Sequence, residues 1–174
     1  MIKEIGLTTM VLSVLLLSGC GGGGSDGGSN NNGSSKLVGT WTDRCDKDNG
    51  YSEQITLVFT STTVEAINKE YNGEVCDENE LTFHAIEKYN YTSGSATKYS
   101  NGKDALEFDI VSTGFTLKKG SVNSIPKNGE KEYSMYSIDG DKLYFSNEDD
   151  AGEFDGSTAS KRSKEYDAAY LTKQ

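Results

Sequence analysis

The chain has 174 residues, of which 17 are basic and 27 acidic, so its net charge at pH 7 is −10. This balance excludes the basic surface that nucleic-acid binding needs, and it repels anionic lipid headgroups. Ten tyrosines, many threonines, serines and glycines, and a single proline favour strands and turns over helices.

The start of the chain has the layout of a secretory signal. Lys3 supplies a positive charge, an apolar run follows over residues 5–17, and the small residues Ser18 and Gly19 close it. The run is too short for a membrane-spanning helix, which needs about 20 apolar residues, and no stop-transfer pattern follows. We therefore expect residues 1–19 to be a signal peptide.

The end of this run carries a four-residue motif. Leu17, Ser18, Gly19 and Cys20 resemble the lipobox of bacterial lipoproteins. In that family the peptide is cut before the cysteine, which carries thioether-linked lipid and usually an amine acylated with a fatty acid such as palmitate. The resemblance implies that Cys20 anchors the chain in the bacterial cell envelope, because more than one acyl chain makes a lasting attachment. Gly21, in place of Asp, implies the outer membrane. The alternative is an ordinary signal peptide with a chance cysteine.

A linker is expected next. Residues 21–35 are almost wholly Gly, Ser and Asn, so they cannot bury apolar surface and should form a flexible coil spanning about 20 Å. A phosphate-binding glycine loop would need a preceding strand and a following helix, and neither is expected. The chain then divides into residues 1–19, the lipidated cysteine and linker over residues 20–35, and one domain over residues 36–174, a normal domain size.

The domain reads as a series of strands. Ile55, Leu57 and Phe59 alternate with smaller or more polar neighbours, the period of two that is typical of a half-buried strand. The expected strands cover residues 37–45, 51–60, 62–70, 81–92, 105–112, 115–119, a hairpin over 133–145, and 168–172, with a loop at 93–103 and a turn at 113–114. No helix is long enough for a crossover, so these strands predict an all-β antiparallel meander. Closure removes exposed edges, which predicts a small barrel of eight or nine strands.

The clearest hairpin turns at Asp139-Gly140, because both residues tolerate the positive φ of a two-residue turn. This turn would place Ile138 opposite Asp141 and Tyr136 opposite Leu143. One face of the hairpin would then carry Tyr136, Ile138, Leu143 and Phe145. The bulky residues expected in the core of the domain include Leu57, Phe59, Phe83, Phe108, Leu143 and Phe145.

The opening of the domain carries a second resemblance. Gly39, Thr40 and Trp41 match the Gly-x-Trp that begins the first strand of the lipocalin-like (calycin) barrels. The resemblance implies that Trp41 closes the floor of a barrel and packs against an arginine from near the C-terminus, for which Arg162 is the candidate. A guanidinium over an indole contributes about 0.5–2 kcal/mol. The alternative is a plain core tryptophan without the Arg162 contact.

Cys45 and Cys76 remain as a pair once Cys20 is lipidated. In an oxidising compartment an even pair favours a disulfide, which would close a loop of about 32 residues and contribute about 3–4 kcal/mol. A metal site at these cysteines would need further ligands, and His84 is the only histidine.

No catalytic constellation is found. His84 has neither a cysteine thiolate nor a nucleophile-elbow serine to act on. A pair of carboxylates for glycoside hydrolysis stays an open alternative, because the sequence does not give the distance between two carboxylates in space. Residues 147–156 form an acidic segment with two glycines, and its side chains offer oxygen ligands of the kind that Ca²⁺ prefers. The spacing of an EF-hand is absent, and the alternative is a solvated acidic loop. The calcium candidates are Asp149, Asp150, Glu153 and Asp155.

Six tyrosines could line a sugar- or peptide-binding face, whereas tyrosines on strands more often pack half-buried. These are Tyr89, Tyr91, Tyr99, Tyr133, Tyr136 and Tyr144. The sequence as a whole predicts a monomeric, lipid-anchored, non-enzymatic binding or structural module without a cofactor. A small apolar ligand would enter the end of the barrel opposite Trp41. The alternative is a closed-core surface interaction or adhesion domain that uses its outer tyrosines and acidic loops.

Overall fold

The structure, a computed structural model, describes residues 34–147 and 155–174. Its strands are β1 (Gly39–Thr42), β2 (Asp46–Asp48), β3 (Tyr51–Phe59), β4 (Thr63–Asn72), β5 (Leu81–Lys98), β6 (Asp104–Lys119), β7 (Lys131–Asp139), β8 (Lys142–Phe145) and β9 (Leu171–Lys173). The helical elements are short: α1 (Ser34–Leu37), η1 (Glu78–Glu80) and η2 (Ala159–Lys161). Within the described ranges, no helix has the length and apolar character needed to cross a membrane.

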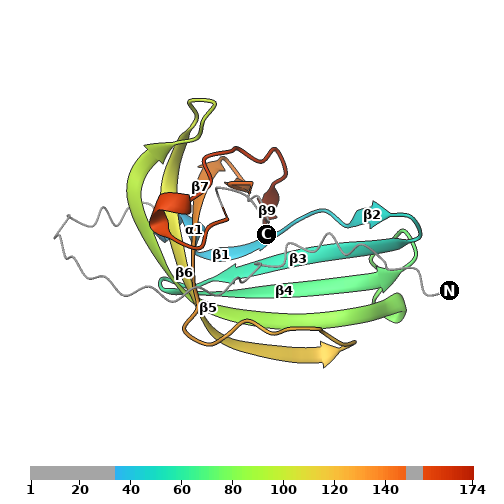
Figure 1. Cartoon of the computed structure of the whole chain (residues 1–174). Coiled ribbons are helices and arrows are strands. Elements are labelled where there is room, and N and C mark those ends of the chain that lie inside the picture. The colour runs from blue at the N-terminus through green and yellow to red at the C-terminus, as the bar shows by residue number, and fades with distance from the viewer. Residues whose placement is uncertain (1–33, 148–154) are drawn as a thin grey trace.

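The strands form one antiparallel sheet that closes on itself (Figure 1). Each strand from β3 to β8 pairs with the next along the chain, and β1 pairs with both β9 and β3. Eight strands therefore make a ring, and β2 extends the sheet beside the first three residues of β3. The predicted all-β antiparallel meander of eight or nine strands that closes on itself is confirmed.

β5 and β6 are longer than predicted, and they bend between the ring and an extended half of the sheet (Figure 1). The loop predicted at residues 93–103 is wrong in its first part, because residues 93–98 continue β5; the turn predicted at residues 113–114 is wrong, because β6 runs through it. The pairing of β5 with β6 changes register at Lys88/Tyr89 and at Ser93/Ala96. Such bulges bend a strand without ending it.

The β7–β8 hairpin turns one residue later than predicted. Asp139 pairs with Lys142, so the two loop residues are Gly140 and Asp141. Gly140 has a φ of +62°, and glycine as first loop residue is typical of a type II′ turn. The predicted register is therefore wrong, and each β7 residue meets a partner two positions further along β8. A shift of two keeps every side chain on its predicted face.

The interior of the ring is packed with apolar side chains from all eight of its strands. Its centre is a set of aromatic rings whose neighbouring centroids lie 5.4–6.1 Å apart: Phe59, Tyr91, Phe108, Tyr136 and Phe145. Of the predicted core residues, Leu57 and Leu143 also belong to this cluster. Phe83 does not, and lies half-buried beside Gly120 in the extended half of the sheet.

The ring closes at β1 and β9, where the two ends of the domain meet. Trp41 pairs with Lys173 in the sheet, and the backbone amide of Gln174 donates to the carbonyl of Thr40 at 2.9 Å. Trp41 is fully buried, and its indole nitrogen donates to the carbonyl of Leu37 at 2.6 Å. The last turn of α1 is thereby fixed beneath β1.

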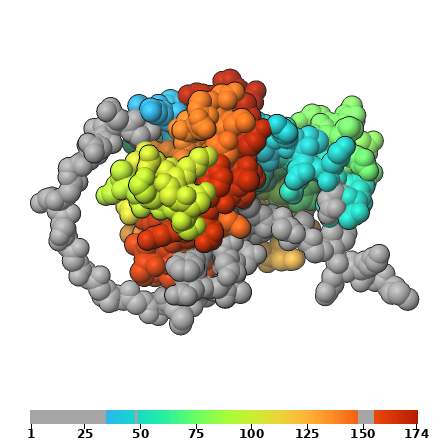
Figure 2. Space-filling model, turned by 90° about the horizontal axis from the view of Figure 1, so that it is seen from above, coloured from blue at the N-terminus to red at the C-terminus, as the bar shows by residue number. Residues whose placement is uncertain are grey.

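Residues 155–170, here called the C-terminal strap, cross the outer face of β6, β7 and β8 before β9 begins. Backbone hydrogen bonds hold the strap at several points: Ser100 to Lys164 at 2.8 Å, Asn147 to Glu165 at 2.9 Å, and Tyr133 to Gly156 at 2.9 Å. Seen from above, the tip of the β5–β6 hairpin, in yellow-green, lies against the red strap (Figure 2). The outer face of this half of the ring is therefore covered.

Candidate functional site

The two cysteines of the domain form the predicted disulfide. Cys45 lies between β1 and β2, Cys76 lies in the connection after β4, and their Cα atoms are 5.8 Å apart. The bond ties the edge of the sheet beside β2 to the turn that follows β4. Cys20, the predicted lipidation site, lies outside the described residues.

The predicted contact between Trp41 and Arg162 is not formed. Lys173 lies over the indole instead, with its Nζ 5.1 Å from the ring centroid. Arg162 lies over the ring of Tyr133, with its guanidinium carbon 5.6 Å from the centroid. The pairing is wrong because Arg162 belongs to the strap on the outer face of the sheet, whereas Trp41 points into the ring.

Arg162 is a buried cation with a full set of partners. Its side chain is 7 % exposed, and its Nη2 lies 2.6 Å from a carboxylate oxygen of Asp109 on β6. Its Nη1 donates to the carbonyl of Phe108 at 3.3 Å and to the carbonyl of Ser134. Arg162 thus joins the strap to two strands through one side chain.

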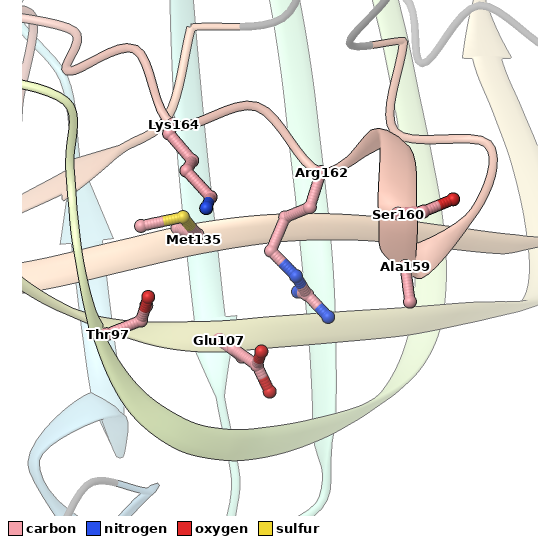
Figure 3. A pocket seen from close by; sticks show the side chains of 7 residues that line it. All are labelled: Thr97, Glu107, Met135, Ala159, Ser160, Arg162 and Lys164. Carbon is pink, nitrogen blue, oxygen red and sulfur yellow. The ribbon is translucent and has the colours of Figure 1, made fainter.

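A cleft of about 380 Å³ opens beside Arg162, between the strap and the sheet (Figure 3). Its walls come from the end of β5, from β6, from β7 and from the strap: Thr97, Glu107, Met135, Ala159, Ser160, Arg162 and Lys164. Its volume is within the range of about 300–1,000 Å³ that is usual for small-molecule sites. Arg162 was the only lining residue singled out from the sequence. The cleft itself was not predicted, because residues 155–164 have no periodic pattern that would place them over the sheet.

The predicted tyrosine-lined binding face is wrong in most positions. Tyr89, Tyr91 and Tyr136 lie in the interior cluster, and Tyr133 lies beneath Arg162. The outer face instead carries a row of packed rings, with centroids 5.2–5.7 Å apart, made of Tyr99, Tyr166, Tyr144 and Tyr170. Tyr166 and Tyr170 come from the strap, and neither was predicted from the sequence.

A lysine enters this row of rings. The Nζ of Lys103 lies 4.5 Å from the ring centroid of Tyr144 and 4.2 Å from that of Tyr166. It also donates to the hydroxyl of Tyr166 at 2.8 Å, and this hydrogen bond raises the pKa of Lys103. Because Lys103 already occupies the faces of these rings, the row packs the strap against the sheet and does not leave the rings free for a ligand.

His84 and Asp155, two further candidates, both have structural surroundings. His84 lies half-buried on β5, where burial and the neighbouring Lys69 lower its pKa. Asp155 accepts from Lys161 Nζ at 2.8 Å and from the amide of Ser157 at 3.0 Å. The other calcium candidates, Asp149, Asp150 and Glu153, lie outside the described residues. Among residues 34–147 and 155–174, no three His, Cys, Asp or Glu side chains gather as a metal site would require.

Asp43 is a half-buried carboxyl group that was not predicted as a site residue. It lies between β1 and β2, and its Oδ1 accepts from the amide of Ile55 at 2.8 Å. Burial raises the pKa of Asp43 to about 7; the Ile55 hydrogen bond opposes this rise, and the nearby Glu53 and Asp46 add to it. The position reads as an ordinary loop aspartate in the sequence, because only the pairing of β3 with two strands encloses it.

No protein-family model matches the chain, and a search of curated proteins finds no match either.

Proposed function

We propose that this chain is a lipid-anchored, non-enzymatic module of the bacterial cell envelope that works through its outer surface. The observation that carries this proposal is the filled interior of the ring, where aromatic rings contact one another at 5.4–6.1 Å. A carrier of a small apolar ligand needs that space for its cargo. The cleft beneath the strap, in contrast, opens outward.

The anchor is supported by residues Leu17 to Cys20, which resemble a lipobox, and by the Gly- and Ser-rich stretch that follows them. A domain on such a stretch would stand off the membrane by about 20 Å, with its outer face accessible to partners. Gly21 after the cysteine supports the outer membrane as the location. Gly39 and Trp41 at the start of β1 support kinship with the lipocalin-like barrels, whose first strand opens in the same way.

Metabolic labelling with radioactive palmitate tests the anchor. In a bacterial host, we expect label in the wild-type chain and none in Cys20→Ser. The double variant Cys45→Ser/Cys76→Ser, which keeps Cys20 as its single cysteine, is the matched control and should stay labelled. Equal labelling of Cys20→Ser and the wild type would contradict the proposal.

Native mass spectrometry of the full chain, purified from its host in mild detergent, tests the use of the interior. We expect the mass of the lipidated protein alone. A retained apolar molecule that survives gentle activation would overturn the outer-surface proposal in favour of the runner-up, a carrier of a small apolar ligand.

A further inference from the structure

The cleft beneath the strap presents two charges of opposite sign that are not paired with each other. Lys164 enters it from the strap, and Glu107 borders it from β6 (Figure 3). Arg162 also lines the cleft, but its charge is already matched by Asp109 at 2.6 Å. The cation left to act on a ligand is therefore Lys164.

Lys164 is held through its backbone, and its side chain is exposed. The Lys164 carbonyl accepts from the amide of Ser100 at 2.8 Å, which fixes the start of the side chain above the cleft. Within residues 34–147 and 155–174, its Nζ has no ion pair or hydrogen bond. An exposed ammonium fixed at its base, pointing over a cleft, suits a carboxylate ligand.

Glu107 is held more firmly. Its Oε2 accepts from the amide of Ser95 at 3.3 Å, and β5 comes so close that a Cβ at Gly94 would lie 2.7 Å from the same oxygen. Glycine at position 94 therefore leaves the space that this carboxylate occupies. One carboxylate oxygen remains for a ligand with a positively charged donor.

The rest of the cleft suits a small molecule with a modest apolar part. Ala159 provides apolar surface, Met135 lies fully buried in the floor, and Thr97 adds one hydroxyl from β5 (Figure 3). A ligand with a single charge would leave either Lys164 or Glu107 without a partner. A ligand that carries both an ammonium and a carboxylate group would satisfy both.

We propose that this cleft binds a free α-amino acid, with the ligand carboxylate at Lys164 and the ligand ammonium at Glu107. The proposal rests on the outer surface being the working face of the module. Its ligand is defined by chemistry: a zwitterion small enough for a cleft of about 380 Å³.

Isothermal titration of the full chain in mild detergent tests the proposal, with the common amino acids as titrants. We expect saturable binding of at least one amino acid. Each of Lys164→Gln and Glu107→Gln should weaken it about tenfold or more, since each removes a charge-assisted hydrogen bond. The matched controls Lys118→Gln and Glu74→Gln, at exposed positions outside the cleft, should bind as the wild type does.

Blocked ligands separate a zwitterion site from a simple charge site. The N-acetyl derivative and the amide of the best ligand each lose one charge, and both should bind about tenfold more weakly. Equal binding of either derivative, unchanged binding by both cleft variants, or no binding of any amino acid at 10 millimolar, roughly the ceiling of a weak site, would overturn the proposal. If the amino-acid proposal fails in one of these ways, palmitate labelling of Cys20 and a ligand-free mass would still support the lipid-anchored module. Failure of the amino-acid site and failure of the proposed function are therefore distinguishable.

Discussion

Arg162 is buried and Asp43 is half-buried, and the two side chains are stabilised differently. Arg162 lies 2.6 Å from a carboxylate and reaches two carbonyl groups, so its charge is matched where it lies. Asp43 accepts one amide hydrogen bond and has two further carboxylates nearby. Burial and the two neighbouring carboxylates raise the pKa of Asp43 to about 7, so this group takes up a proton near neutral pH.

We predict a pH-dependent stability from Asp43. Burial raises its pKa to about 7 in the folded protein, so between about pH 4 and pH 7 the folded state keeps a proton that the unfolded state has released. Stability should therefore fall as pH rises through this window. Because the group is partly solvated, we expect a contribution of only about 1–2 kcal/mol.

The variant Asp43→Asn keeps an acceptor for the Ile55 amide and removes the titration. Urea unfolding at pH 4.5 and pH 8 should show a smaller loss for this variant than for the wild type, and greater stability of the variant at pH 8. Asp141→Asn, at the exposed β7–β8 turn, is the control and should follow the wild type. Identical pH profiles for Asp43→Asn and the wild type would contradict the assignment.

We predict that Arg162→Met destabilises the domain by about 3 kcal/mol. The change leaves Asp109 and two buried carbonyl groups without their donor, and breaking a buried pair usually costs about 3–5 kcal/mol; Asp109 is 40 % exposed, which favours the lower figure. Arg44→Met, at an exposed arginine that also packs on a tyrosine, should cost about 1 kcal/mol or less. Denaturant unfolding compares the two, and equal losses would show that the burial of Arg162 adds nothing.

Single residues were predictable from the sequence where one fact decided their state. Cys45 and Cys76 were the only cysteines left to pair, and Trp41 was a large apolar residue in a strand. The partner of Trp41 was not predictable, because Lys173 reaches the indole only through the pairing of β1 with β9. A residue's burial follows from its own chemistry, but its partner follows from the register.

At the scale of elements, the strap depends on side chains that lie far from it in sequence. Lys103, at the β5–β6 turn, lies between the rings of Tyr144 on β8 and Tyr166 in the strap. Each such contact contributes about 0.5–1 kcal/mol when exposed. Together with the backbone bonds, they hold the strap over the cleft.

We predict that Lys103→Gln loosens the strap without unfolding the ring. The variant loses both cation–π contacts, about 1–2 kcal/mol, and only the strap depends on them. Hydrogen exchange should become roughly tenfold faster at the amides of Ser100, Asn147 and Asp167, which bond across the edge of the strap, with little change in Tm. Lys98→Gln, at an exposed pair with Asp104 on the same hairpin, should leave these amides as they are. Faster exchange throughout the sheet would contradict a local role.

Strand existence was predictable, whereas strand ends were not. Alternation of apolar residues placed β3 and β4 to within two residues, and parity placed the faces of β7 and β8 correctly despite the wrong register. β5 runs six residues beyond its predicted end through Ser93 and Gly94, because pairing with β6 and a bulge stabilise residues that have low strand propensity. The strap has no periodicity, since its contacts are with the sheet rather than with itself.

At the scale of the molecule, closure of the sheet decides stability and association. β9 has only three residues, but it lies between β1 and β8 and removes the exposed edge of each. Open edges pair readily with other chains. The hairpin order of the strands was enough to predict the antiparallel meander and its closure. The place of β2 outside the ring was not predicted, because the strand expected over residues 37–45 ends at Thr42 and a separate strand begins at Asp46.

We predict that removing residues 171–174 destabilises the protein and makes it associate. The loss of Leu171 from the interior costs about 1.5–3 kcal/mol, and two strand edges become free. Light scattering after size exclusion should show concentration-dependent oligomers, and Tm should fall. A chain with four Gly and Ser residues added after Gln174 changes the length equally and keeps β9, so it should remain as the wild type. A monomeric truncated chain of unchanged Tm would show that closure is dispensable.

The pairing of β1 on both sides has a mechanical consequence. A pulling force that reaches the domain through the residues before Ser34 acts first on Leu37 and then on β1. That strand is hydrogen-bonded to β3 along one side and to β9 along the other, and Leu37 and Trp41 are buried beneath it. Both ladders must slide at once, and both side chains must leave the interior, before the strand can be drawn out. β1 therefore resists extraction through two ladders at the point where a tether would apply force.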